Sequence, residues 1–491
     1  MHSASKRELT RISPYNRKEG QGYMRKEYRE YHFDRMVQSI IHFASLSYDG
    51  THKEGFGMFR YAPRFRDAIQ TILMTGEPGV LLLKMIDTYL IEILTAHENG
   101  KKVALCTFNF SPGVLKPLDV VPICLEPVTT LGVAMWLRGL GEYLNYCCEV
   151  GFTETSCSAQ RGALGAYLAG LGVRPDFVLC NSIGVCDTNA TAFNFAAEYL
   201  ELPFYQLNAP PTLVDERART YHRHDFRGLI SFVEEQTGKN LDCDLLREVI
   251  VETDKQDEIM CEIEDLMRLT PSPVPGIFNL FMYSAKYIYG GSRVATEIME
   301  SMLKVSKHNA AQGRAGTTSG KEEARAFSVY VDHYSAQLRP WAWFDEKNIS
   351  HLGCMMNGFW PVHAPYATGD LKEGTYTMDP TNEETMLDSL ADQMSRMPMV
   401  KQIRGPYDDP HQWLTDTVAS IKTYKPTFCL YTGTIGCRNT WGSIKILARD
   451  TEKMGIPTLI LFGDAFDHRI TSWESMRDRI DEFLTVRRIL E

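Results

Sequence analysis

The chain has 491 residues, a length that corresponds to about two to four domains. Its 52 basic and 62 acidic side chains give a formal net charge of −10, and 44% of its residues are hydrophobic. This composition excludes a disordered chain and a general nucleic-acid-binding protein, and it allows large buried cores. Twelve cysteines are too sparse for a small disulfide-stapled fold, so their positions need another explanation.

The N-terminal segment is basic and polar. Residues 1–35 carry nine Lys or Arg residues against five acidic ones, which predicts a surface arm or a partner-contact segment. The segment lacks the apolar stretch of a secretory signal, and no window of the chain offers the ~18 uninterrupted apolar residues of a membrane span. We therefore expect a cytoplasmic protein whose cysteines are thiols or metal ligands. Apolar residues three to four positions apart predict helices over 60–98, which completes an N-terminal region of residues 1–99.

Residues 100–212 predict a first α/β lobe. Short apolar runs predict its strands, and longer stretches between them predict its helices. The alternation of strands and helices is typical of a parallel sheet. The expected strands lie within 101–110, 120–127, 175–180 and 202–210, and the expected helices are 159–171 and 190–200.

Residues 213–312 are long, charged and helically periodic, so they predict a helical insertion that is broken at Thr270–Pro275. The run from His222 to Asp225 could suggest zinc, but it has no nearby cysteine or HExxH partner. We expect this run to be a solvated polar turn. Residues 310–323 are small and polar and predict a linker.

Residues 323–491 return to the α/β pattern and predict a second lobe with a closing helix at Trp473–Leu490. The sequence shows no repeat between the two lobes. The predicted fold class is therefore α/β, with two parallel-sheet lobes, a helical insertion between them and an N-terminal helical extension. The expected strand-and-loop units are 324–337, 349–362, 426–437 and 457–467.

Three cysteines stand in loops at the ends of these elements. Cys186 and Cys437 follow expected strands, and Cys157 lies just before the helix at 159–171. In parallel α/β folds, sites form beyond the carboxyl ends of the strands. Three thiolates could hold a [4Fe–4S] cluster and leave one iron open as a Lewis acid, although this spacing alone does not identify a metal site. The other cysteines are interpreted as buried thiols or, for the Cys147–Cys148 pair, stay ambiguous.

Three stretches resemble one known family. They are the cysteine loop and small-residue helix at 151–170, the strand, Cys-Asp loop, helix and strand at 175–211, and the Cys-Arg turn with its following helix and Asp-bearing strand end at 426–469. Together they resemble the D-component subunits of the 2-hydroxyacyl-CoA dehydratase family, which includes the related subunits of class I benzoyl-CoA reductase. The order of the motifs and the middle helical block also fit, so the resemblance covers roughly residues 100–490.

The resemblance implies two flavodoxin-like lobes with one [4Fe–4S] cluster in the cleft between them. The ligands carried over are Cys157, Cys186 and Cys437, with Cys180 as a competitor of Cys186 that is less free to reach the cleft. The loop after the first strand would face the cleft, which makes Asn109 and Ser111 candidates for substrate contact or members of a capped polar loop. The resemblance also implies a heterodimer with a related second subunit.

The implied chemistry is radical dehydration of an acyl-CoA thioester. A separate ATP-hydrolysing iron–sulfur activator delivers one electron, the thioester carbonyl becomes a ketyl radical anion, and the 2-hydroxyl is expelled. Loss of a β-proton and recycling of the electron give an enoyl-CoA. The alternatives are a benzoyl-CoA-reductase-like oxidoreductase subunit and a partner that only relays electrons. The long basic lead-in and the entry strand at 327–338, which lacks the usual small-residue loop, depart from the family pattern.

Overall fold

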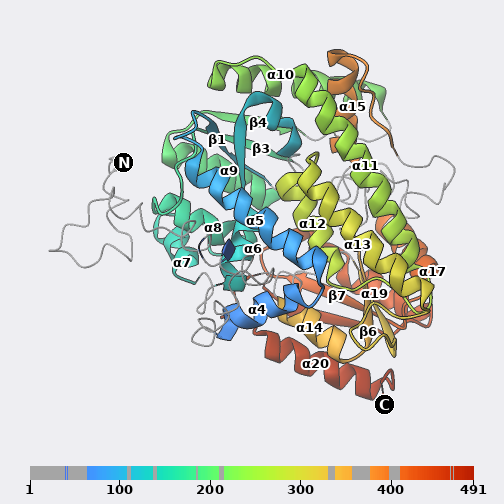
Figure 1. Ribbon diagram of the computed structural model, residues 1–491. Coiled ribbons are helices and arrows are strands. Elements are labelled where there is room, and N and C mark those ends of the chain that lie inside the picture. Colours follow the sequence, from blue (N-terminus) through green and yellow to red (C-terminus); the bar gives the residue numbers. More distant parts are fainter. Residues whose placement is uncertain are drawn as a thin grey trace.

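The structure is a computed structural model with two sheets surrounded by helices (Figure 1). Asn109, Ser111 and the basic arm lie outside the described residues. The described residues are 39, 41–42, 63–107, 112–135, 141–183, 186–208, 215–329, 338–355, 376–396, 410–464, 466–467 and 469–490.

The first sheet has four parallel strands in the order β2-β1-β3-β4. Its central strands are nearly continuous apolar runs, as expected for a parallel sheet that is covered by helices on both faces. This order is the flavodoxin-like order of the first four strands. The strands are β1 (Lys102–Cys106), β2 (Val120–Cys124), β3 (Phe177–Ile183) and β4 (Phe204–Asn208).

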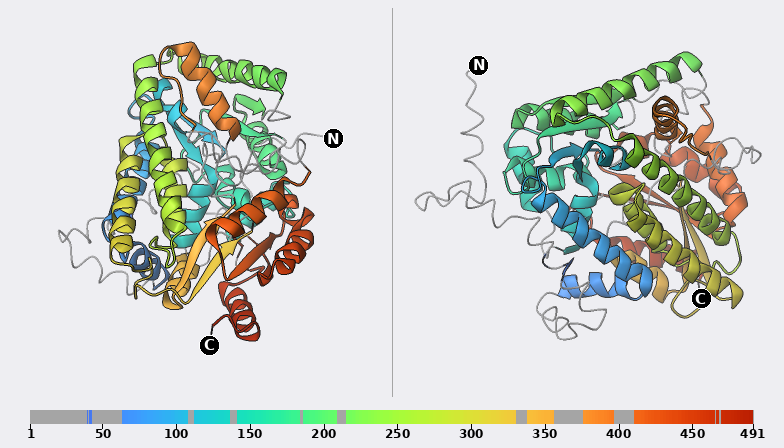
Figure 2. Two further views of the ribbon diagram at one scale, coloured as in Figure 1. Left: turned by 90° about the vertical axis from the view of Figure 1, so that its right-hand side faces the viewer. Right: turned by 45° about the horizontal axis from the view of Figure 1, so that its top comes forward.

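The second sheet repeats this topology with the order β6-β5-β7-β8, again all parallel. The expected α/β fold with two parallel-sheet lobes is therefore confirmed. Figure 2 shows this second lobe in yellow to red and the first lobe in blue to teal. The strands are β5 (Ala324–Ser328), β6 (Ile349–Cys354), β7 (Phe428–Thr434) and β8 (Thr458–Gly463).

Helices make up most of the remaining described chain. None of them is both long and apolar enough to cross a bilayer. The extension and first lobe contain α4 (Pro63–Leu73), α5 (Glu77–Thr95), α6 (Leu125–Met135), α7 (Gly141–Glu149), α8 (Ser158–Leu168) and α9 (Asp187–Leu200), with short 3-10 turns at Pro112–Val114 and Lys116–Leu118. The insertion contains α10 (Glu216–Thr237), α11 (Cys243–Met267), α12 (Phe278–Tyr289) and α13 (Arg293–Ala311). The second lobe contains α14 (Leu338–Glu346), α15 (Glu383–Arg396), α17 (Gln412–Tyr424), α18 (Arg438–Gly442), α19 (Ile444–Lys453) and α20 (Trp473–Val486).

Arg325 attaches the helical insertion to the second lobe. It lies in β5 and is only 4% exposed, so its charge needs partners inside the protein. Its guanidinium pairs with Glu322 and donates to the carbonyl oxygens of Met267 and Leu269 at the end of α11. These carbonyls have no partner within a helix, so Arg325 satisfies them and fixes where α11 ends.

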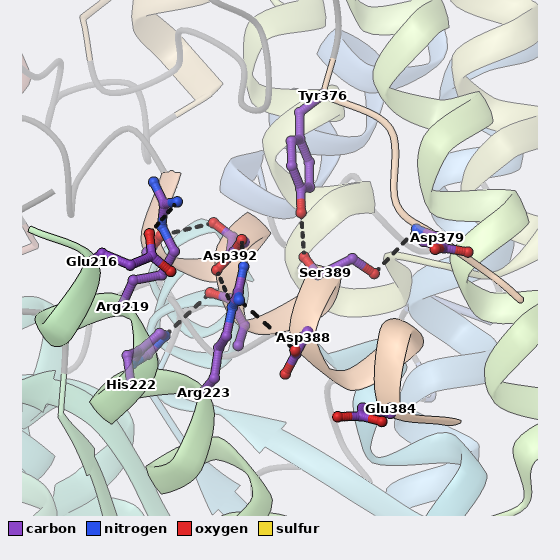
Figure 3. A network of polar contacts seen from close by, with 12 residues as sticks. Glu216, Arg219, His222, Arg223, Tyr376, Asp379, Glu384, Asp388, Ser389 and Asp392 are labelled. Atoms are coloured by element: carbon purple, nitrogen blue, oxygen red, sulfur yellow. Dashed lines mark hydrogen bonds and ion pairs between the residues drawn. The ribbon is translucent and has the colours of Figure 1, made fainter. Parts of the chain in front are cut away.

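Helix α15 belongs to the second lobe in chain order but packs against α10 and α11 of the insertion (Figures 1 and 3). Arg223 of α10 pairs with Asp392 of α15, and Tyr376 donates to the Ser389 carbonyl. The predicted solvated turn from His222 to Asp225 is wrong, because these residues lie inside α10. His222 is buried between the Asn208 and Ala391 carbonyls because α15 covers this face.

Candidate functional site

The three loop cysteines each occupy the N-cap position of a helix. Cys157 precedes α8, Cys186 lies between β3 and α9, and Cys437 lies between β7 and α18. Since β3 and β7 are the third strands of their sheets, Cys186 and Cys437 occupy equivalent places in the two lobes. Both therefore lie beyond the carboxyl ends of parallel strands, where α/β folds place their sites.

Backbone N–H groups of the first helical turn lie near each sulfur, and one of them donates a hydrogen bond to Cys186. The Asn189 N–H donates to the Cys186 sulfur over 3.5 Å. The Ala159 N–H lies near the Cys157 sulfur, and the Thr440 and Asn439 N–H groups lie near the Cys437 sulfur. These N–H groups lower the pKa of their thiols, and the positive end of a helix also favours a thiolate. The first helical turns therefore favour negative charge on the three sulfurs.

Burial opposes that charge. It raises the pKa of Cys157 and of Cys437, and it raises the pKa of Cys186 to about 12. The neighbouring Cys437 raises the pKa of both Cys157 and Cys186 further, so the structure brings the three thiols close together. Three neighbouring thiolates repel one another, and a bound cationic group would remove that repulsion.

In the described part of the chain, no three His, Cys, Asp or Glu side chains are arranged to hold a single metal ion. In a [4Fe–4S] cluster each thiolate binds a different iron, so the three sulfurs need not converge on one point. Cysteine thiolates are also the donors that such clusters use.

A buried polar cluster lies near the thiols. Gln160 of α8 donates to Glu126, which lies in the first turn of α6 and raises the pKa of Cys186. The Oε1 of Gln160 and both side-chain polar atoms of Asn189 are buried without a hydrogen-bond partner among the described residues. Buried polar atoms without partners are rare and often mark a bound group or water. These orphaned atoms are consistent with a ligand at the thiols.

The two lobes meet closely at the cysteines. Gly436, just before Cys437, has a φ of 81°, and a Cβ there would lie 2.7 Å from the backbone of the Thr155–Cys157 loop. Only glycine combines this backbone conformation with such close contact. The contact presses the turn that bears Cys437 against the loop that bears Cys157.

Cys180 lies inside β3 and is fully buried in the core, whereas Cys186 lies beyond the strand. Sequence reasoning missed Glu126 and the pair formed by Ser158 and Asp464. Glu126 had a signal, because it is an acidic residue near the end of the apolar run expected as a strand at 120–127. The hydrogen bond between Ser158 and Asp464 joins residues 306 positions apart and has no local signature.

A comparison with protein-family models finds a match over residues 118–486 to the D-component of 2-hydroxyglutaryl-CoA dehydratase. The chain belongs to this family. The match spans both sheets from β2 onward and all three N-cap cysteines, and it confirms the resemblance read from the motifs. No protein with a curated description matches the chain.

Membership in the D-component family makes the chain a component of the 2-hydroxyacyl-CoA dehydratase type. A D-component acts together with a partner component and an activator. The matched region contains the helical insertion, the second sheet and the first lobe from β2 onward.

Proposed function

We propose that this chain is the iron–sulfur subunit of a 2-hydroxyacyl-CoA dehydratase, a lyase that converts a 2-hydroxyacyl-CoA into an enoyl-CoA. Cys157, Cys186 and Cys437 would hold one [4Fe–4S] cluster with one iron open. A related second subunit and an ATP-hydrolysing iron–sulfur activator would complete the system. The observation that carries the proposal is the meeting of three N-cap cysteines from two lobes in a chain of this family.

The bound cluster would supply one electron to the thioester carbonyl of the substrate. The reaction as a whole is redox-neutral, because the C2–O bond breaks, the hydroxide leaves with a β-proton as water, and the electron is returned. The protein must therefore hold the thiolates, exclude solvent and move one proton. The N-cap turns serve the first task, since their N–H groups favour the thiolate form of the half-buried cysteines.

Glu126 is the candidate for the proton transfer. Its side chain is 8% exposed, and it is the carboxylate that raises the pKa of Cys186. The carboxylate can accept the β-proton and return it to the departing hydroxide, which is general acid–base chemistry. Gln160 holds the group in place by donating to its Oε1.

Metal analysis tests the cysteine assignment. Full-length protein purified without oxygen is expected to contain about four iron and about four acid-labile sulfide per chain. Replacing Cys157, Cys186 or Cys437 with Ser should remove the cluster, because a Ser hydroxyl is a poor iron ligand. Cys148→Ser is the control, since Cys148 is partly buried beside Arg161 yet is none of the proposed ligands. Retention of iron in all three variants would refute the assignment.

The variant Glu126→Gln tests the proton-transfer role. It should keep the iron content but lower the dehydration rate by about 10²–10⁴-fold with partner and activator present. An unchanged rate would exclude Glu126 from the chemistry. Reduction of an aromatic ring in place of dehydration would favour the reductase alternative. A substrate analogue that perturbs only the partner's cluster spectrum would favour the electron-relay alternative.

A further inference from the structure

A buried hydrogen-bond clasp joins the two lobes one residue after Cys157. Ser158, the first residue of α8, is fully buried and donates to Oδ1 of Asp464, which directly follows β8. The same Ser158 oxygen accepts the Phe466 N–H over 2.9 Å. Oδ1 of Asp464 also accepts the N–H groups of Phe466 and Asp467, over 3.0 and 2.8 Å. One carboxylate oxygen therefore accepts hydrogen bonds both from the loop after β8 and from the first residue of α8.

A second contact from the same loop reaches α7. Arg469 donates to Oδ1 of Asn145 over 2.8 Å, and Asp467 orients its guanidinium through two bonds of 2.8 and 2.7 Å. Arg469 is about half exposed, so this ion pair contributes little stability by itself. The Ser158–Asp464 bond is buried, so its loss would leave polar groups without partners and would cost more.

The clasp bears directly on the position of the Cys157 sulfur. Asp464 lies close enough to raise the pKa of Cys157. Arg161 supports the preceding turn by donating to the Ser156 carbonyl over 2.9 Å, but that contact stays within the first lobe. The clasp and the Gly436 contact both link the Cys157 turn to the second lobe.

We infer that Asp464, acting through Ser158, is a positioning residue that fixes Cys157 opposite Cys437. The inference rests on the proposed function for its catalytic meaning, but the positioning itself is a property of the protein without iron. The role requires a hydrogen-bond acceptor at Oδ1 rather than a charge. Asn at position 464 keeps that acceptor and Ala removes it.

Thiol reactivity in the iron-free, full-length protein tests the positioning. Iodoacetamide labelling with quantification of each cysteine by mass spectrometry gives the rate for Cys157 relative to Cys186. This ratio should rise at least tenfold in Asp464→Ala and Ser158→Ala, and it should stay within twofold of wild type in Asp464→Asn. If Asp464→Ala does not fold, Ser158→Ala decides, because it removes only one hydroxyl.

Thr458→Val is the matched control. Thr458 forms a buried 2.6 Å bond with Thr451 in the same lobe, six residues before Asp464, and does not reach α8. Its ratio should stay at the wild-type value. An unchanged ratio in Ser158→Ala, or an equal rise in Thr458→Val, would overturn the inference.

Spectroscopy of the reconstituted protein extends the test to the cluster. After addition of iron and sulfide, Ser158→Ala should bind the same amount of iron as wild type but show an altered EPR spectrum, with Asp464→Asn restoring the wild-type spectrum. An unaltered spectrum in Ser158→Ala would overturn the link to the cluster. Failure of wild type to bind iron would refute the proposed function. The labelling experiment would still show whether Asp464 and Ser158 position Cys157.

Discussion

His351 is a buried imidazole whose neutral form is fixed by its neighbours. Nδ1 accepts the Gly353 N–H over 3.2 Å, and Nε2 lies 3.3 Å from the Ser328 hydroxyl. The rings of Trp341 and Phe344 pack edge-on against the imidazole, with their centroids 4.8 and 5.1 Å from its centroid. Burial lowers the pKa of His351 to about 3. Proton uptake at Nδ1 would break the bond from Gly353.

This environment predicts a loss of stability in acid. Between about pH 6 and pH 4 the unfolded chain binds a proton on His351 and the folded chain does not. As the pH falls through this range, His351 should therefore lower the free energy of unfolding by ~1.4 kcal/mol per pH unit. His351→Asn keeps an acceptor for Gly353 and should remove that share of the slope. Urea unfolding at pH 7, 6 and 5 checks the difference between the two proteins. Parallel slopes would contradict the prediction.

At the same scale, sequence reasoning placed the three cysteines at element ends, and the structure brings them together. This was possible because strand ends in a parallel sheet share one edge, so a local pattern carries long-range information. The partners of these residues were not predictable. Ser158 and Asp464 meet only when two lobes pack, and nothing near either residue in the sequence indicates the other. Asn109 and Ser111 remain predictions.

At the scale of elements, a buried ion pair ties the insertion together. Lys286 of α12 binds Asp257 of α11, and Gln393 of α15 donates to the other carboxylate oxygen over 2.9 Å. Both charged side chains are at most 5% exposed. Burial raises the pKa of Asp257 to about 6 even though Lys286 opposes that shift. The pair therefore fixes which helices pack together, and each charge depends on the other.

Removing one partner should be far more costly than removing both. Lys286→Met leaves the Asp257 carboxylate buried and unpaired and should lower the free energy of unfolding by about 3–5 kcal/mol at pH 7.5. Asp257→Leu combined with Lys286→Met should recover most of that loss. Lys255→Met is the control, because the Lys255–Glu300 pair is largely exposed and contributes under about 1 kcal/mol. Equal losses in Lys286→Met and Lys255→Met, measured by urea unfolding, would contradict this view.

Element prediction succeeded where the pattern was long and periodic, as in the insertion, and failed where tertiary contacts decide. The His222–Asp225 run has the composition of a turn, but it continues α10 because α15 covers that face and pairs with Arg223. The position of α15 itself could not be predicted. Its amphipathic pattern gives a helix but does not say that it packs on the insertion rather than on its own sheet.

At the scale of the whole molecule, two sheets of identical strand order face a shared centre although their sequences show no repeat. Strand order depends on the pattern of strands and crossovers, so the topology survives without residue-level similarity. One consequence is that Cys186 and Cys437 occupy equivalent positions in the two lobes. Cys157 is a third cysteine, and the first lobe provides it. The three N-cap cysteines therefore come together only when the lobes are docked.

Gly436 offers a direct test of that docking. Gly436→Ala introduces a Cβ about 2.7 Å from backbone atoms of the opposite lobe and should separate the lobes at the cysteines. Gly455→Ala is a matched control, because Gly455 has a φ of 83° but no atom within 4 Å of the added Cβ. Both variants carry the ~1–2 kcal/mol cost of a left-handed alanine, so only the clash distinguishes them. Gly436→Ala should lose at least a further ~1 kcal/mol of unfolding free energy and most of its iron after anaerobic purification, whereas Gly455→Ala should keep its iron. Equal iron in the two variants would show that the centre does not depend on this contact between the lobes.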